Sequence, residues 1–131
     1  MMDDMSIPNL SGCTGDSHNG YVGELKADFT ARRSDACGVE FVTGSVTSDG
    51  VYEIVGGRDL GGLMQKALKP ANPHLKWLDA VWHTYTRMTI TPSRAYATYI
   101  GVSTIESPDY ESFVVKEFEV PEGQSRLIFE P

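Results

Sequence analysis

A run of alternating side chains in the second half of the chain, followed by a turn and a returning run, strongly limits the possible folds. Residues 81–90 alternate between two faces, and residues 95–102 return after the turn. A period of two is typical of β-strands. Between the runs, Thr91-Pro92-Ser93-Arg94 carries proline at its second position, where a tight turn favours it. The two runs are therefore predicted to pair as an antiparallel hairpin with one packed face and one wet face.

Other segments extend this pattern toward a sheet-rich fold. Residues 39–47 are rich in β-branched side chains and end at a turn signal, Ser48-Asp49-Gly50. Residues 21–29 carry apolar or small side chains at odd positions and mostly charged ones at even positions. That run fits a half-buried strand by its period and a helical turn by its composition. Shorter strands are expected at residues 74–78, 112–120 and 126–129.

One segment has the spacing of a helix. Apolar side chains recur at i, i+3, i+4, i+7 and i+8 within residues 58–68, which predicts one buried helical face. These side chains are Leu60, Leu63, Met64, Ala67 and Leu68. Pro70 and Pro73 are expected to end the helix. The glycine-rich residues 56–62 lack the Gly-Lys-Ser/Thr pattern of a phosphate-binding loop, so they are interpreted as a flexible loop with Asp59 near the helix N-terminus.

Together these elements predict a single α+β domain over residues 1–131, mostly antiparallel β-sheet with one main helix. A chain of 131 residues is long enough to bury a core without metal or disulfide support. Its 40% hydrophobic and 22% charged residues exclude a disordered chain. The two cysteines, Cys13 and Cys37, lack the spacing of a zinc site. They are expected to be free thiols or, in an exported protein, a single disulfide.

The net charge of the chain limits the classes of molecule that it is expected to bind. A formal net charge of -7 repels a phosphate backbone, which argues against binding to nucleic-acid duplexes. The densest basic point, Arg32-Arg33, is expected in a solvated loop. A phosphate substrate stays compatible, because a bound metal ion reverses the local sign of charge. No apolar run approaches the roughly 18 residues of a membrane span, and the acidic segment Met1 to Met5 lacks the features of a signal peptide. The compartment stays open.

The segment best suited to carry a functional site is Thr14-Gly15-Asp16-Ser17-His18-Asn19, which follows a short apolar run at residues 7–13. Asp16 supplies a hard anionic oxygen and His18 a neutral nitrogen or a general acid. Two ligands at i and i+2 of an extended loop can point to the same side. Loops at strand ends often carry active sites, because a rigid scaffold positions them within reach of substrate.

A plainer interpretation of the same loop stays open. Asp16 would cap a tight turn through backbone hydrogen bonds, and His18 would be an exposed side chain without a role. The other two histidines have weaker contexts. His74 is expected to be a turn residue, and His83 a partly buried aromatic neighbour of Trp82 and Tyr85. The aromatic residues of this region are expected in the core or on the sheet surface rather than at a ligand.

The order of several motifs resembles the C-terminal part of the alkaline phosphatase D family, in the calcineurin-like metallophosphatase superfamily. The resemblance covers roughly residues 7 to 128 and rests on motif order rather than on one decisive motif. The matching segments, in order, are Gly15-Asp16-Ser17-His18, Glu24-Leu25-Lys26-Ala27-Asp28, Glu40-Phe41-Val42 with Ser45 and Ser48, Asn72-Pro73-His74-Leu75, and the strand that ends in Thr91-Pro92.

The resemblance implies a phosphomonoesterase or phosphodiesterase, built as part of an α/β metallophosphatase sandwich around a calcium and iron cluster. It implies Asp16 as a metal ligand, His18 as a metal ligand or catalytic partner of the transition state, and Asn19 and Ser17 as residues that support them. The family's earlier metal motifs are absent from these 131 residues. The chain is therefore expected to be incomplete alone and to need a missing N-terminal half or self-association.

One alternative is a non-catalytic β-rich binding module that keeps the scaffold, and a weaker one is residual hydrolysis by the lone loop. The incomplete-enzyme hypothesis predicts an exposed apolar face, with residues 21–29 and 39–46 as the strands to inspect.

Overall fold

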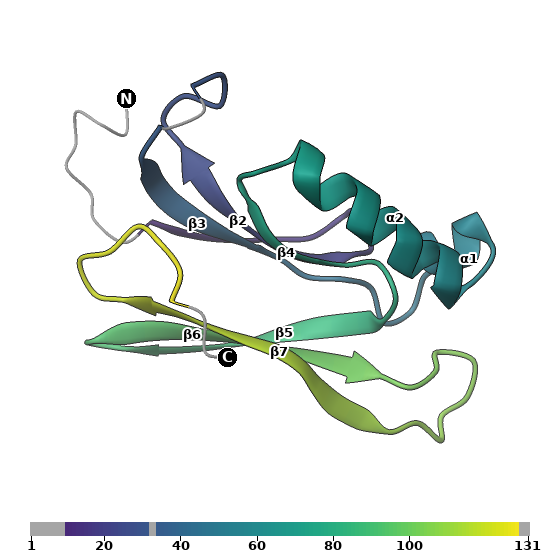
Figure 1. Ribbon diagram of the computed structural model, residues 1–131. Helices are drawn as coiled ribbons and strands as arrows, with labels where there is room; N and C mark the ends of the chain where they lie inside the picture. Colours follow the sequence, from purple (N-terminus) through teal and green to yellow (C-terminus); the bar gives the residue numbers. More distant parts are fainter. Residues whose placement is uncertain (1–9, 32–33, 129–131) are drawn as a thin grey trace.

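Two β-sheets pack face to face, and two helices lie on the outer side of the first sheet (Figure 1). The computed structural model describes residues 10–31 and 34–128. The first sheet has the strand order β1-β3-β2-β4, made of β1 (Ser11–Thr14), β3 (Ala36–Val42), β2 (Gly20–Lys26) and β4 (Leu75–Asp79). The second has the order β5-β6-β7, made of β5 (His83–Thr91), β6 (Arg94–Val102) and β7 (Ser112–Pro121). The helices are α1 (Val51–Val55) and α2 (Arg58–Ala71).

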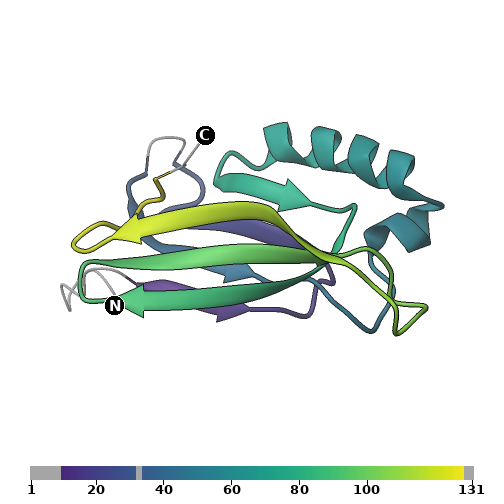
Figure 2. The same cartoon turned by 90° about the horizontal axis from the view of Figure 1, so that it is seen from below.

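The predicted class, an α+β fold of mostly antiparallel sheet, is confirmed. All strand pairs within the two sheets are antiparallel except β1 with β3, which run parallel. The predicted hairpin is the β5–β6 pair, which closes through Pro92 and Ser93. Its outer face carries exposed polar side chains such as Arg87 and Thr89. Viewed from below, this face has no described helix over it (Figure 2).

The core fills the space between the two sheets. The first sheet contributes Val22, Val39 and Phe41, and the second contributes Ala97, Tyr99, Phe118 and Val120. Trp77 joins them, with its ring 4.6 Å from that of Tyr99. The Tyr99 hydroxyl donates a hydrogen bond to the Tyr21 carbonyl oxygen at 3.0 Å and so ties the sheets together. Burial raises the pKa of this hydroxyl, which keeps it a neutral donor.

Residues 21–29 form a strand in their first part, and not a helical turn. The apolar or small side chains of this run are mostly at odd positions, but Val22, at an even position, is completely buried between the sheets. The charged side chains beside it are neutralised at the strand end. There, the Glu24 carboxylate lies 3.1 Å from Lys26 Nζ and 2.9 Å from Lys76 Nζ.

β3 begins earlier and ends earlier than the predicted strand at residues 39–47. It stops at Val42, because the next residues turn away from the sheet. The Ser45 hydroxyl accepts hydrogen bonds from the backbone N–H groups of Thr47 and Ser48, which bends the chain locally. At the other end of the chain, the strand expected at residues 126–129 is reduced to one bridge between Ile128 and Glu119.

The predicted helix exists, but its surroundings differ from expectation. α2 continues through Pro70, which lies in its last turn, where the missing N–H costs a single hydrogen bond. A second helix, α1, was not predicted. Gly56 and Gly57 separate the two helices with φ angles of 96° and 129°, so the loop predicted for residues 56–62 is only these two residues long.

The apolar face of α2 points outward instead of into the core. Leu60, Leu63, Met64, Ala67 and Leu68 are all exposed, with 63% of the Leu63 side chain accessible. The buried position is Gly61, where a Cβ would lie 2.5 Å from the Ala80 carbonyl oxygen. α2 therefore contacts the end of β4 through its backbone at Gly61 and through the Gln65 side chain, whose Oε1 atom accepts the Ala80 N–H at 3.3 Å. The apolar residues of β2 and β3, where an exposed face was expected, are instead largely inside the sandwich.

Cys13 and Cys37 are free thiols, so the disulfide alternative is not realised. In the part of the chain that is described, no helix is long and apolar enough to cross a membrane. Residues 7–9, the segment Met1 to Met5, the pair Arg32-Arg33 and Phe129 lie outside the described residues.

Candidate functional site

The loop between β1 and β2 holds Asp16 and His18, the two predicted site residues, in an unusual backbone conformation. Asp16 has a φ angle of 75° and His18 one of 55°, and no other described residue except glycine has a positive φ. Aspartate and histidine tolerate this left-handed region better than most residues, but it still costs free energy. Such conformations cluster at functional sites, where the surrounding structure holds them in place.

A hydrogen bond fixes the ring of His18. Its Nδ1 atom lies 2.7 Å from the carbonyl oxygen of Asp49, 31 residues further along the chain. A carbonyl oxygen can only accept, so Nδ1 carries the hydrogen. In the neutral ring, Nε2 therefore keeps its lone pair. Histidines that bind a metal through one ring nitrogen usually donate the N–H of the other nitrogen to a carboxylate, a backbone carbonyl or water. The ring of His18 has this arrangement.

The Asp16 carboxylate is exposed and makes no hydrogen bond to any residue in the described ranges. The turn-capping interpretation predicted backbone bonds to this side chain. Other aspartates in the chain do make such bonds: the Asp28 carboxylate accepts from Thr30 N, and the Asp79 carboxylate from Val81 N, both at 2.7 Å. The Asp16 oxygens are thus available to an outside partner.

Asn19 and Ser17 brace the loop internally. The Asn19 side-chain nitrogen donates to the Ser17 carbonyl oxygen at 2.9 Å, and the Ser17 hydroxyl donates to the Asn19 carbonyl oxygen at 3.4 Å. The Asn19 Oδ1 atom is buried and has no partner among the described residues. A buried acceptor without a partner is costly, so this oxygen is suited to bind a water molecule or a cation.

His83 and Glu53 lie behind this loop, and sequence reasoning did not connect them to it. The His83 ring is 1% exposed, with Nδ1 3.0 Å from the Ser45 carbonyl oxygen and Nε2 2.7 Å from Glu53 Oε1. Its aromatic neighbour is Tyr52, at a centroid distance of 5.2 Å. Burial acts to raise the pKa of Glu53, but hydrogen bonds from Tyr52 and His83 lower it below its ordinary value.

One sequence signal could have revealed Glu53. It stands three residues after Gly50, the residue that caps α1, and its Oε2 atom accepts the Gly50 N–H at 2.8 Å. A glutamate at that position is half of a capping box, which marks the start of a helix. The turn at Ser48-Asp49-Gly50 was correctly noticed, but the helix after it was not.

His74 is not brought to the loop. Its ring packs edge-on against Phe29 at 5.3 Å, and its carbonyl oxygen accepts the Glu24 N–H, toward the other end of β2. Arg58 covers the Trp82 ring at 4.1 Å, which leaves that aromatic surface occupied by the chain itself.

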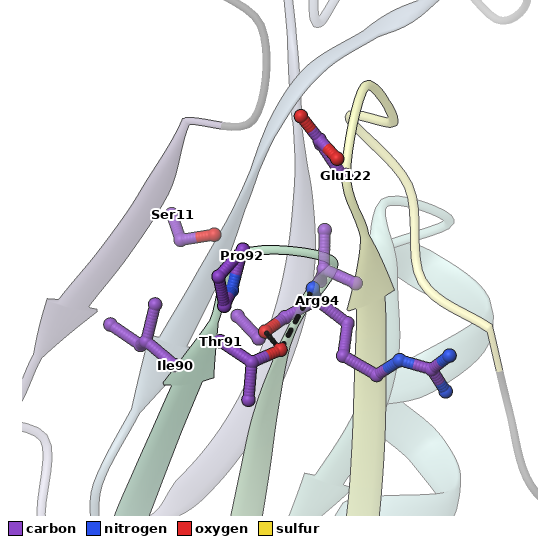
Figure 3. Close-up of a pocket in the computed structure, with 8 residues that line it drawn as sticks. Ser11, Ile90, Thr91, Pro92, Arg94 and Glu122 are labelled. Atoms are coloured by element: carbon purple, nitrogen blue, oxygen red, sulfur yellow. Dashed lines mark hydrogen bonds between the residues drawn. The ribbon is translucent and has the colours of Figure 1, made fainter.

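An open pocket of about 290 Å³ lies at the opposite end of β5 from His83, beside the Pro92 turn (Figure 3). In Figure 3 the Arg94 guanidinium points away from Ser11 and Ile90. It is paired with Glu119 at 3.1 Å. The pocket therefore contains none of the predicted site residues and offers little chemistry of its own.

Comparisons with known proteins agree with the resemblance seen in the sequence. A family model described as PhoD-like phosphatase matches residues 1–99. Alkaline phosphatase D of Bacillus subtilis (strain 168) is 31% identical over 103 residues, which is 79% of this chain and 16% of that protein. A solved structure, described as the structure of PhoD, superposes with a TM-score of 0.78 at 23% identity.

The superposition covers 98% of this chain and 23% of the solved one, so the two share this part of the fold. The chain spans less than a quarter of the length of either relative. Because the family model covers about three quarters of its residues, the chain belongs to the PhoD-like phosphatase family.

Proposed function

We propose that this chain is the C-terminal part of a metal-dependent phosphoester hydrolase, acting on phosphomonoesters or phosphodiesters. In this proposal residues 1–131 form one unit, and the loop from Gly15 to Asn19 faces the metal cluster. Asp16 and His18 bind metal, His18 also contacts the reacting phosphoester, and Ser17 and Asn19 hold the loop. The observation that carries the proposal is the His18–Asp49 hydrogen bond, because in the neutral ring it leaves the lone pair on Nε2, the atom that would bind a metal.

The donor set suits the metals that the family resemblance implies. A carboxylate oxygen at Asp16 is a hard ligand that calcium accepts, and an imidazole nitrogen at His18 suits iron. When bound, such metals polarise the phosphoryl oxygens and supply a nucleophilic water or hydroxide. The chain's own contribution is to orient these donors, through the His18–Asp49 hydrogen bond and the hydrogen bonds between Ser17 and Asn19.

The donors are too few to form a complete site. No group of three or more His, Cys, Asp or Glu side chains within residues 10–31 and 34–128 is arranged to hold a metal ion. A two-metal site draws ligands from several strand ends. We therefore infer that the remaining ligands come from another part of the family fold, whether it is continuous with this chain or a separate chain.

The exposed apolar face of α2, together with Ile54 of α1 at 78% exposure, supports the same inference. The relatives are several times longer than this chain, and the additional polypeptide is the natural cover for that face. A monomer rarely leaves such a row of leucine and methionine side chains in water without a partner.

The decisive experiment measures hydrolysis of p-nitrophenyl phosphate and bis-p-nitrophenyl phosphate with calcium and iron supplied. The chain is assayed alone and mixed with the preceding portion of a PhoD-like phosphatase. We expect no turnover by the chain alone, and turnover by the mixture that falls at least about 100-fold in Asp16→Ala and His18→Ala.

Two other outcomes would change the proposal. Turnover by the chain alone, lost in both variants, would mean that it assembles a working site by itself. If neither preparation turns over substrate although the two parts form a stable complex, the chain is a non-catalytic binding module on the same scaffold.

A further inference from the structure

A continuous line of hydrogen bonds leads from the buried start of β5 to the His18 ring. His83 contacts the Ser45 carbonyl oxygen through Nδ1 and the Glu53 carboxylate through Nε2. Glu53 in turn accepts the Gly50 N–H. Ser45 and Gly50 are the two ends of the loop that contains Asp49. The His83–Glu53 pair therefore holds both ends of that loop.

The loop is held tightly against the site. A Cβ added at Gly50 would lie 3.2 Å from the His18 carbonyl oxygen, 3.4 Å from Glu53 Oε2 and 3.7 Å from His83 Cε1. The backbone at Gly50 thus touches the site loop on one side and the buried pair on the other. Any shift of residues 45–50 would move the Asp49 carbonyl oxygen, which is the atom that sets the tautomer of His18.

We propose that His83 and Glu53 are positioning residues, which fix the Asp49 carbonyl so that His18 presents an unprotonated Nε2 to the cluster. This inference rests on the function proposed above. Both nitrogens of His83 already face oxygen atoms of the protein at hydrogen-bonding distance, so neither is directed at a metal ion. Its contribution is geometric and reaches the site only through the loop.

A neutral histidine side chain that is free in water favours the hydrogen on Nε2. If His83 and Glu53 position the Asp49 carbonyl, His18 should have the Nδ1–H tautomer. That tautomer should depend on His83 and Glu53, although His18 does not contact either residue. Losing the bond to Asp49 removes roughly 1 kcal/mol of net stabilisation from that tautomer, equivalent to about a fivefold change in the tautomer ratio. A merely structural role for His83 would lower global stability and leave the tautomer unchanged.

The test uses the metal-free 131-residue chain with ¹⁵N-labelled histidine, at about pH 8.5, where an ordinary imidazole is neutral. Two-bond ¹H–¹⁵N correlation spectra report which nitrogen carries the hydrogen, and His18→Gln assigns the signal. We expect Nδ1–H in the wild type and a shift of about fivefold toward Nε2–H in Glu53→Ala and His83→Leu. Phe118→Leu, which loosens the core elsewhere, is the matched control and should keep the wild-type tautomer.

The inference is overturned if His18 carries its hydrogen on Nε2 in the wild type, or if both network variants fold and keep Nδ1–H. If His83→Leu fails to fold, Glu53→Ala decides, because the Glu53 side chain is 26% exposed and its loss is milder. A shift of equal size in Phe118→Leu would also overturn it. These readouts need no metal and no turnover. A failure of the positioning role is therefore measured separately from a failure of the hydrolase proposal.

Discussion

Gly44 and Thr84 approach so closely that no side chain fits between them: a Cβ on Gly44 would lie 2.6 Å from Thr84 Oγ1. The same Cβ would lie 3.2 Å from the Thr84 carbonyl oxygen and 3.3 Å from its backbone nitrogen. Thr84 is completely buried and directly follows His83. The contact therefore joins the loop after β3 to the start of β5, directly behind the candidate site.

Gly44→Ala should destabilise the chain by about 1–3 kcal/mol, because the new methyl group must displace backbone as well as side-chain atoms. Urea unfolding followed by circular dichroism measures the change. Gly12→Ala is the matched control, since its nearest neighbour would be 3.9 Å away, and it should change stability by less than about 0.5 kcal/mol. Equal effects of the two substitutions would contradict the close approach.

Glu24 predicts a loss of stability in acid. Burial alone would raise the pKa of its carboxyl, but hydrogen bonds from Lys76 and Lys26 lower it below the ordinary value. A lowered pKa in the folded state adds stability above the unfolded pKa of about 4.3, and this stability is lost as pH falls through the folded pKa. Unfolding free energies of wild type and Glu24→Gln should therefore converge below about pH 4.

The difference at neutral pH should be no more than about 1 kcal/mol, because the lysine partners remain partly in water. Glu106→Gln, at an exposed position in the connection between β6 and β7, provides the control and should change the unfolding free energy at pH 7 by less than about 0.5 kcal/mol. A gap that persists unchanged into acid would mean that the Glu24 charge is not involved.

For Asp79, we expect the opposite change of stability with pH. Burial raises the pKa of its carboxyl above the ordinary value, although backbone N–H groups of Val81 and Trp82 act to lower it. The folded state then holds its proton longer, so stability falls as pH rises from about 3.9 through the folded pKa. Asp79→Asn keeps the acceptor oxygen and removes the charge. It should equal or exceed wild-type stability at pH 7 and lose that advantage near pH 3.5, in the same unfolding assay.

The parts of this molecule that could be predicted are those decided by neighbours in sequence. The β5–β6 hairpin follows from its period of two and from Pro92 in the turn. The face of β2 could not be predicted, because the lysine that neutralises Glu24 from β4 lies 52 positions away, at Lys76. α2 was found by its periodicity, but its exposure depends on what covers it, and periodicity does not distinguish a core from an interface.

The candidate site also has a part that could be predicted from neighbouring residues and a part that could not. The spacing of Asp16 and His18 marked the loop as a candidate beside the plainer interpretation of a capped turn, and both residues have a left-handed backbone. The contacts that orient the loop could not be foreseen. His18 meets Asp49 across 31 residues, and Glu53 meets His83 across 30, through a helix that the sequence did not reveal. Long-range hydrogen bonds of this kind leave no periodic trace.

Leu63→Glu tests whether the apolar face of α2 is open in this chain. Because the side chain is 63% exposed, a charge there should change the free energy of unfolding by less than about 0.5 kcal/mol. Binding of a fluorescent apolar dye should fall, since the patch is interrupted. Val39→Ala, at a completely buried position, should cost about 1–3 kcal/mol in the same assay. A comparable cost at Leu63 would place that side chain in the core.

The last prediction concerns the backbone strain at Asp16. Its φ of 75° is a conformation that glycine adopts freely and alanine does not. Asp16→Gly should therefore stabilise the chain relative to Asp16→Ala by about 1 kcal/mol, measured by urea unfolding at constant m-value. The glycine and alanine variants of Asp35, an exposed residue without a positive φ, should show the reverse order of stability. Glycine at that position only adds freedom to the unfolded chain. Both Asp16 variants lack the carboxylate, so in the proposed assembled hydrolase both should lose activity although one is the more stable protein. Loss of turnover in the more stable variant as well would show that the Asp16 carboxylate is needed for chemistry and not for the fold. Equal stability of the two variants would mean that the left-handed backbone at Asp16 is not populated in solution.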